Sequence, residues 1–287
     1  MNRVAMLIAA VMLQAQVMAA APPTCEQNSP SCQAVGSWRF AVAVGAGVID
    51  NPLYGGDDIP LLVVPSISYY GERFFIENLS AGYTFVDDAA LDISFVSEFN
   101  DEATYFYRYH PRNIFFNGQA EALSAVKDDA VRLSINQIAD RDWALDAGVR
   151  LHWYWRANTK LTAQWLHDIS GVYQGYHATL ALNQRFDALF SHDDSLTIGA
   201  GLTYKDSALT DYYYGVGYRD KVDRWYQYQA GSGVSPFMNL SYSKPINASW
   251  RFLLRAKYSR LGSHISASPL VAKDDSYAVF VAGSYAF

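Results

Sequence analysis

The amino-acid sequence predicts an all-β fold, a transmembrane antiparallel β-barrel of about twelve strands that follows a cleaved signal peptide. Three observations lead to this prediction. Apolar residues make up 51% of the 287 residues, yet the mean hydropathy is only -0.05. Apolar and polar residues alternate at every second position along most of the chain. The chain also begins like an exported protein and ends in an aromatic residue, Phe287.

The composition excludes several other classes of protein. Aromatic residues make up 15% of the chain and charged residues 17%, against about 25% in ordinary soluble domains, which disfavours disorder. A helical membrane protein needs apolar runs of about 18 residues, and the run at 4–13 has only ten. Two cysteines are too few for a disulfide-rich scaffold, and a net charge of -6 disfavours a nucleic-acid partner.

Residues 1–21 have the three-part layout of a secretory signal peptide. Arg3 gives a basic start, an apolar stretch follows at 4–17, and small residues close it at 19–21. We expect residues 22–36 to form a periplasmic lead before a barrel at 37–287. Cys25 and Cys32 lie in this lead and can form a disulfide that closes an eight-residue loop. Chain entropy gives such a clip about 2–3 kcal/mol at most.

The clearest alternation lies at 142–156, where seven apolar side chains share one face of a strand. The other face is mainly polar and carries Asp146, Arg150 and His152. The same pattern recurs at 38–45, 196–205 and 249–259. Helical periodicity would not sort these residues onto two faces, so the pattern indicates strands.

A soluble sandwich also has one apolar face per strand, and three features favour a membrane barrel instead. Tryptophan and tyrosine lie near the ends of the apolar faces, as in interfacial girdles. The strands run for about ten residues or more, the length that crosses a bilayer when tilted. The last strand, with its terminal Phe287, resembles the assembly signal of bacterial outer-membrane barrels. We therefore expect the outer membrane of a Gram-negative bacterium, with its lipid and lipopolysaccharide as neighbours.

An even number of strands brings both chain ends to the periplasm, so we expect about twelve, with about ten or fourteen as alternatives. The segment 129–139, in which Val131, Leu133 and Ile135 alternate with polar residues, supplies the least distinct strand. The others are expected near 37–49, 61–70, 73–86, 90–100, 142–156, 158–167, 175–187, 194–205, 234–244, 247–260 and 276–287.

This trace places the long connections 206–233 and 261–275 outside the cell and the segment 101–128 in the periplasm. The segment 101–128 is long for a periplasmic turn and rich in aromatic residues. We expect it to fold into the lumen as a plug or to offer a periplasmic contact surface, unless a strand boundary is misplaced. Its aromatic residues are Tyr105, Phe106, Tyr107, Tyr109, Phe115 and Phe116.

Motifs that carry chemistry are missing from the sequence, which has no Cys-x-x-Cys, phosphate-binding glycine loop or Gly-x-Ser-x-Gly elbow. His152 and His177 fall on predicted lumen faces, where a hydrogen-bond network is a simpler role than catalysis. Five Asp-Asp pairs lie at expected turns, where aspartate bonds nearby amides. We therefore predict no enzyme activity and no catalytic, cofactor-binding or metal-binding residues.

Charged side chains are expected on the lumen faces of several strands. They could favour anions in a pore, or they could pair with lumen acids such as Asp92 and Glu98 and brace the barrel. The lumen charges that we single out are Arg39, Asp146, Arg150, Arg185, Arg251 and Arg255.

Seven short motifs occur along the chain: YGGDD at 54–58, PSISY at 65–69, AGY at 81–83, DYYYGV at 211–216, YQAG at 228–231, YSRLG at 258–262 and SPLV at 268–271. In this order and spacing they resemble the MipA/OmpV family of outer-membrane proteins. The resemblance spans about residues 37–287, with departures at 103–116 and in the cysteine-bearing lead. It implies an outer-membrane barrel. The family's namesake is described as a scaffold that links the lytic transglycosylase MltA to a bifunctional penicillin-binding protein, so the resemblance implies these two kinds of partner.

Three functions stay open at the level of sequence. The first is a non-enzymatic scaffold that links murein-synthesising and murein-hydrolysing enzymes. The second is a channel or porin for small solutes. The third is a barrel enzyme acting on lipid or peptide, which ranks last because no nucleophile, base and orienting residue fall into register.

Overall fold

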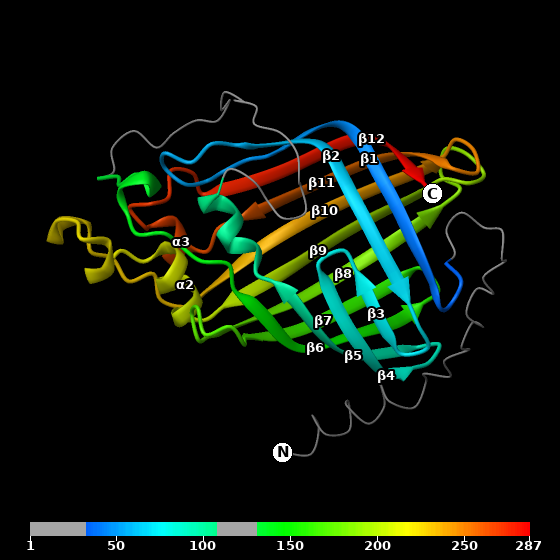
Figure 1. The fold of residues 1–287 in the computed structure, drawn as a ribbon, viewed down its shortest axis with the longest axis horizontal. Coiled ribbons are helices and arrows are strands. Elements are labelled where there is room, and N and C mark those ends of the chain that lie inside the picture. The colour runs from blue at the N-terminus through cyan, green and yellow to red at the C-terminus, as the bar shows by residue number, and fades with distance from the viewer. Residues whose placement is uncertain (1–32, 108–130) are drawn as a thin grey trace, which may run out of the picture.

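The computed structural model describes residues 33–107 and 131–287 (Figure 1). The expected signal peptide and the pair Cys25 and Cys32 lie outside the described residues. Twelve antiparallel strands close into a barrel, because β1 pairs with both β2 and β12. The strands are β1 (Ser37–Ile49), β2 (Ile59–Tyr70), β3 (Phe74–Glu77), β4 (Ser80–Asp87), β5 (Leu91–Phe99), β6 (Leu145–Arg156), β7 (Thr159–Asp168), β8 (Tyr176–Asp187), β9 (Ser195–Lys205), β10 (Gly233–Pro245), β11 (Trp250–Arg260) and β12 (Asp275–Ala286).

Short helices occupy the connections between strands. They are η1 (Asp101–Phe106), η2 (Ile135–Gln137), α2 (Ser207–Tyr214), η3 (Tyr218–Asp220), η4 (Arg224–Tyr226) and α3 (Ser263–Ser266). Among the residues that the structure describes, no helix is long and apolar enough to cross a membrane.

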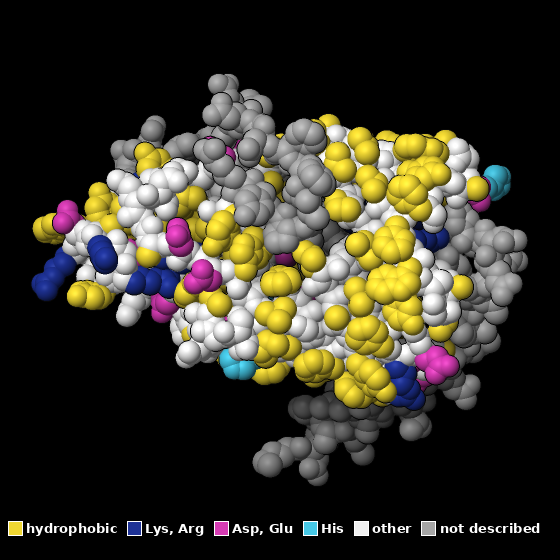
Figure 2. Space-filling model, in the orientation of Figure 1, with side chains coloured by type: hydrophobic (Ala, Val, Ile, Leu, Met, Phe, Trp, Pro, Cys, Tyr) yellow, Lys and Arg dark blue, Asp and Glu magenta, His cyan; other side chains and the backbone are white. Residues whose placement is uncertain are grey.

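Apolar side chains cover the outside of the barrel wall, as Figure 2 shows for one face. The strand register explains this surface, since apolar residues of adjacent strands lie opposite one another. Val149 pairs with Phe95 on one side and with Trp165 on the other. Leu180 and Leu202 form another such pair. The outer surface therefore offers lipid a continuous apolar band.

The predicted strand at 129–139 is wrong. Its described part contains η2 rather than a strand, and Leu133 is buried beneath neighbouring loops. The twelfth strand comes instead from 73–86, which is a hairpin of β3 and β4. Asn78 makes the tight turn because it adopts a left-handed conformation with φ of 56°. A two-residue turn interrupts the alternation too briefly to be seen in the sequence.

The two ends of the barrel differ. Short turns join the strands at one end, which we call the turn end. Both described chain ends lie there, since Gly36 N–H donates to Tyr70 O at 2.7 Å and Phe287 N–H to Phe40 O at 3.0 Å. The opposite end, which we call the loop end, carries the connections 50–58, 100–144, 169–175, 206–232 and 261–274.

The prediction that the segment 101–128 lies in the periplasm, beside the chain ends, is wrong for its described part. The extra strand gained from 73–86 reverses the direction of β5, so the chain leaves β5 at the loop end. The expected strand boundary was therefore misplaced.

Candidate functional site

All five long connections contribute described residues to a packed apolar group at the loop end. We call it the mouth cluster. The exposed fraction of its members is 7% or less. They are Leu53, Ala103, Leu133, Ala144, Tyr173, Leu209, Tyr213, Tyr214, Val216, Ala230, Leu261, Ile265, Leu270 and Val271.

Helix α2 supplies the centre of the mouth cluster. It begins where the Asp206 side chain accepts a hydrogen bond from Leu209 N–H at 3.0 Å, which is a standard N-cap. The helix turns Tyr213 inward, and the Tyr213 ring lies 6.1 Å from the rings of Phe106 and Tyr173. Connections that are far apart in the sequence therefore meet around one tyrosine.

The described part of the predicted aromatic segment packs into this mouth. Tyr105 O accepts a hydrogen bond from the Asn51 side chain at 2.8 Å. The Tyr107 ring stacks on Trp143 with 5.7 Å between centroids. Phe106 lies against the mouth cluster. The plug role stays a proposal for the segment as a whole, because Tyr109, Phe115 and Phe116 lie outside the described residues.

Glu102 attaches η1 to the barrel wall and to α2. One of its carboxylate oxygens forms an ion pair with Lys205, and the other accepts a hydrogen bond from the Tyr214 hydroxyl. Burial and the negative charge of Glu102 raise the pKa of Tyr214 well above its usual value. Tyr214 therefore stays protonated and acts as the donor.

Buried ion pairs fix the loops further. Arg141 Nη2 lies 2.9 Å from Asp220 Oδ1, and both side chains are 0% exposed. This pair joins the connection 100–144 to the connection 206–232. Lys273 forms a second buried pair with Asp50, which joins 261–274 to 50–58. The connections at the loop end are thus held together by polar contacts as well as by apolar packing.

The predicted lumen charge Asp146 lies just beneath the mouth cluster. Its carboxylate is fully buried and lies 3.0 Å from His177 Nε2. It also accepts a hydrogen bond from Asn100 Nδ2 at 2.6 Å. Asp146 therefore connects the ends of β5, β6 and β8 across the interior.

Arg150 and Arg185, two further predicted lumen charges, have acidic partners. Arg150 Nη2 lies 2.7 Å from Glu98 Oε2, and Gln164 contacts both members of this pair. Arg185 pairs with Asp187 at 2.6 Å in a more exposed position. The Arg150–Glu98 pair braces the neighbouring strands β5 and β6, whereas Arg185 and Asp187 both belong to β8.

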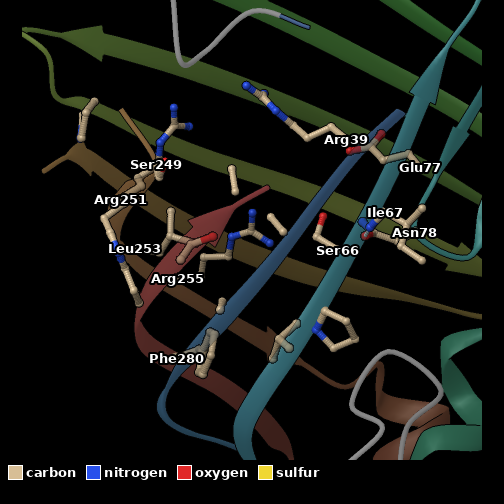
Figure 3. Close-up of a pocket in the computed structure, with 18 of the residues that line it drawn as sticks. Arg39, Ser66, Ile67, Glu77, Asn78, Ser249, Arg251, Leu253, Arg255 and Phe280 are labelled. Atoms are coloured by element: carbon tan, nitrogen blue, oxygen red, sulfur yellow. Dashed lines mark hydrogen bonds between the residues drawn. The ribbon is translucent and has the colours of Figure 1, made fainter. Parts of the chain in front are cut away.

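The three remaining predicted charges, Arg39, Arg251 and Arg255, come together. They line a cavity of about 430 Å³ in the half of the lumen nearest the turn end (Figure 3). Glu77 of β3 lines the same cavity. A second cavity of about 540 Å³ adjoins it, since Val64, Arg255 and Phe280 line both. We call the first one the arginine cavity.

Sequence reasoning missed Glu102, Lys205 and Glu77. Lys205 lies on the polar face of the predicted strand 194–205, so its position in the alternating pattern was a usable signal. Glu102 and Glu77 gave no such signal, because one lies in a helical turn and the other in the unrecognised hairpin. Within the described ranges, no group of three or more His, Cys, Asp or Glu could hold a metal ion.

A closed antiparallel barrel with an apolar exterior, a charged interior and long loops at one end defines an outer-membrane β-barrel. The family model described as MltA-interacting protein MipA matches residues 42–287. The chain therefore belongs to the MipA family and is an outer-membrane protein.

Individual relatives are distant. The chain is 23% identical over 239 residues to the MltA-interacting protein of Escherichia coli K12, covering 82% of this chain and 85% of the relative. It is 23% identical over 288 residues to outer membrane protein OmpV of Vibrio cholerae, covering 100% of both. The translocator domain of the autotransporter NalP from Neisseria meningitidis has a similar structure, with 11% identity, a TM-score of 0.39 and 90% of each chain covered.

Proposed function

We propose that this protein is a non-enzymatic scaffold that links murein-synthesising and murein-hydrolysing enzymes at the outer membrane. The name of the Escherichia coli relative, MltA-interacting protein, supports an interaction with a lytic transglycosylase. A penicillin-binding protein is the second partner proposed, on the family resemblance. The turn end faces the periplasm in barrels of this class, so partners of this kind would bind there.

The closed loop end is the observation that carries the proposal. A channel needs a continuous path, whereas the mouth cluster joins all five long connections in buried packing. A loop end packed in this way suits a periplasmic binding role better than transport.

The histidines favour the scaffold over a barrel enzyme. His152 Nδ1 lies 2.9 Å from the Thr162 hydroxyl, and His177 Nε2 lies 3.0 Å from Asp146. One histidine therefore lies beside a hydroxyl group and the other beside a carboxylate, but the two pairs lie on different parts of the barrel wall. His152 and Asp146 are separated by six residues of β6, or about 20 Å at the usual rise of a strand. A catalytic triad needs all three groups together.

Capture of a murein enzyme tests the scaffold directly. The folded barrel in detergent, immobilised and exposed to purified lytic transglycosylase, should retain it. Phe190 and Ile246 are exposed apolar residues in turns at the turn end. The double substitution Phe190→Ser and Ile246→Ser should weaken capture about tenfold or more if they contribute to the contact as typical interface anchors do.

Trp225→Ser provides the matched control, because Trp225 is also an exposed apolar residue but lies at the loop end. It should leave capture unchanged. If the folded barrel retained neither a lytic transglycosylase nor a penicillin-binding protein, the scaffold role would be refuted.

The scaffold and the channel alternative predict opposite results for conductance in planar bilayers. We expect the purified barrel to show no stepwise conductance, because the mouth cluster closes the lumen at the loop end. A general porin reconstituted in the same detergent serves as the positive control. Reproducible current steps from the pure protein would establish a channel in place of a closed scaffold.

A further inference from the structure

The connection 206–232 carries an aromatic and basic projection at the loop end. After α2, its residues 217–227 contain η3 and η4 and protrude beyond the strand ends, at the far left of Figure 1. Two aromatic side chains of this segment are almost fully exposed, Tyr218 at 96% and Trp225 at 91%. Figure 2 shows lysine and arginine side chains beside apolar ones in the same region. We call residues 217–227 the basic tip.

The mouth cluster holds the basic tip in place. Val216 and Tyr228 join the two sides of its base through a pair of backbone hydrogen bonds, each 2.9 Å long. Val222 and Tyr226, which belong to the tip, pack against the mouth cluster. The buried ion pair of Asp220 fixes η3 to the connection 100–144. The tip therefore presents its outward side chains from a fixed frame, which lowers the entropy cost of binding a partner.

The exposed charges of the basic tip are mainly positive. Arg219, Lys221 and Arg224 are all exposed. Of the two carboxylates in the tip, that of Asp220 is neutralised in its buried ion pair, and that of Asp223 is exposed. The whole chain has a net charge of -6, so the tip is a positive region on an acidic protein. Such a region attracts an anionic partner that the rest of the surface would repel.

Exposed aromatic rings beside cations match a phosphorylated saccharide. The faces of tyrosine and tryptophan rings pack against the C–H groups of sugar rings, while the sugar hydroxyl groups stay in water. Guanidinium and ammonium groups bind phosphate oxygens through charge-assisted hydrogen bonds. The long loops of outer-membrane barrels face outside, where lipopolysaccharide carries phosphate groups on its core saccharide. A partner with both required groups therefore surrounds the loop end.

We propose that the basic tip binds the phosphorylated core saccharide of lipopolysaccharide in the surrounding outer leaflet. Tyr218 and Trp225 pack on sugar rings, and Lys221 and Arg224 bind phosphate groups. The site is independent of the scaffold role, because the murein enzymes proposed for that role bind at the turn end. Either proposal can hold without the other.

Isothermal titration calorimetry on the folded barrel in a nonionic detergent tests the proposal. The probe is the water-soluble core oligosaccharide of deacylated lipopolysaccharide, which keeps its phosphate groups. Deacylation removes the lipid chains, so contacts with the apolar barrel wall cannot contribute to the signal. The oligosaccharide should bind, with an affinity that falls as salt is added. The same oligosaccharide after chemical removal of its phosphate groups should bind about fivefold or more weakly.

Two double variants assign the binding to the basic tip. Lys221→Gln with Arg224→Gln should weaken binding about fivefold or more, because two charge-assisted contacts are lost. This variant should also bind the phosphorylated and dephosphorylated oligosaccharides almost equally. Tyr218→Ser with Trp225→Ser should weaken binding of both oligosaccharides about fivefold or more, because the stacking on sugar rings is lost. All four side chains are exposed, so both variants should fold like the wild type.

Arg260→Gln is the matched control. Arg260 is an exposed cation that ends β11 at the loop end and lies outside the tip. Its replacement should leave binding unchanged. Arg219 is kept in every variant, because its guanidinium group stacks on the Tyr212 ring at 4.2 Å from the centroid and supports the tip.

Each outcome decides the proposal. If the core oligosaccharide does not bind the wild-type barrel, the tip is not a lipopolysaccharide site. If Arg260→Gln weakens binding as much as the charge variant of the tip does, the attraction is general and no site exists there. Unchanged binding in the aromatic variant, with folding verified by mobility on unheated gels, would overturn the recognition of sugar rings and with it the proposal.

Discussion

Replacing Arg141 with methionine should open the loop end while leaving the barrel wall intact. Methionine keeps most of the side-chain length but leaves Asp220 buried without its guanidinium partner, which lies 2.9 Å away in the wild type. Breaking a buried ion pair in this way typically costs about 3–5 kcal/mol. We expect the amides of Val216 and Tyr228, which bond each other across the loop, to exchange hydrogen roughly a hundredfold faster or more.

Arg141→Met combined with Asp220→Asn separates lost charge pairing from lost packing. Asparagine carries no charge, and its single amide oxygen can still accept the hydrogen bond from Gly217 N–H, which is 2.8 Å long in the wild type. It gives up the longer bond from Ala139 N–H at 3.3 Å, because its amide nitrogen only donates. The double variant should therefore recover much of the protection that the single variant loses. Equal exchange rates in the two variants would show that the buried charge is not the cause.

Truncating Tyr213 to alanine should cause the largest loss of order within the mouth cluster. Tyr213 is fully buried, and its ring contacts those of Phe106, Tyr173 and Tyr212. Removing a buried aromatic ring typically costs about 3–5 kcal/mol, because a cavity stays behind. The expected result is rapid hydrogen exchange throughout α2 and a loss of the near-ultraviolet circular dichroism of the packed tyrosines.

Tyr213→Phe is the matched control. It keeps the ring and removes only the hydroxyl group, which donates to Asp142 O at 3.0 Å. Loss of that hydrogen bond should cost only about 0.5–1.5 kcal/mol. If phenylalanine and alanine had equal effects, the hydroxyl contact rather than ring packing would hold the mouth together.

Most of the barrel wall could be predicted from the sequence. The strands expected at 142–156 and 247–260 correspond to β6 and β11, each of which begins three residues later than expected. The number of strands was also correct, but through two compensating errors. The β3–β4 hairpin was read as one strand, and 129–139 was taken as a strand although η2 lies there. An alternating pattern shows only that a segment has one apolar and one polar face. A loop buried beneath other loops, such as 129–139, can produce the same pattern as a strand.

The candidate site was only partly predictable. The polar faces of β1, β6 and β11 identified Arg39, Asp146 and Arg255 as interior residues. Their partners depend on which strands become neighbours, and this is decided by barrel closure between β1 and β12. Glu102 and Tyr214, which meet in the mouth, are 112 residues apart in the sequence. No local pattern can report such a contact.

The sequence by itself determined the class of this protein: an exported chain whose apolar residues, placed at every second position, must face lipid in a closed barrel. That result follows from local geometry, because successive side chains of a strand point to opposite faces. Only the tertiary structure decided the rest. It placed the segment after β5 at the loop end, packed five connections into the mouth cluster and gathered three arginines at the turn end. The physical reason is that the whole closed sheet sets the direction and the neighbours of each strand. The two-residue turn at Asn78 adds one strand, which reverses the direction of β5 and moves the connection after β5 to the other end of the barrel.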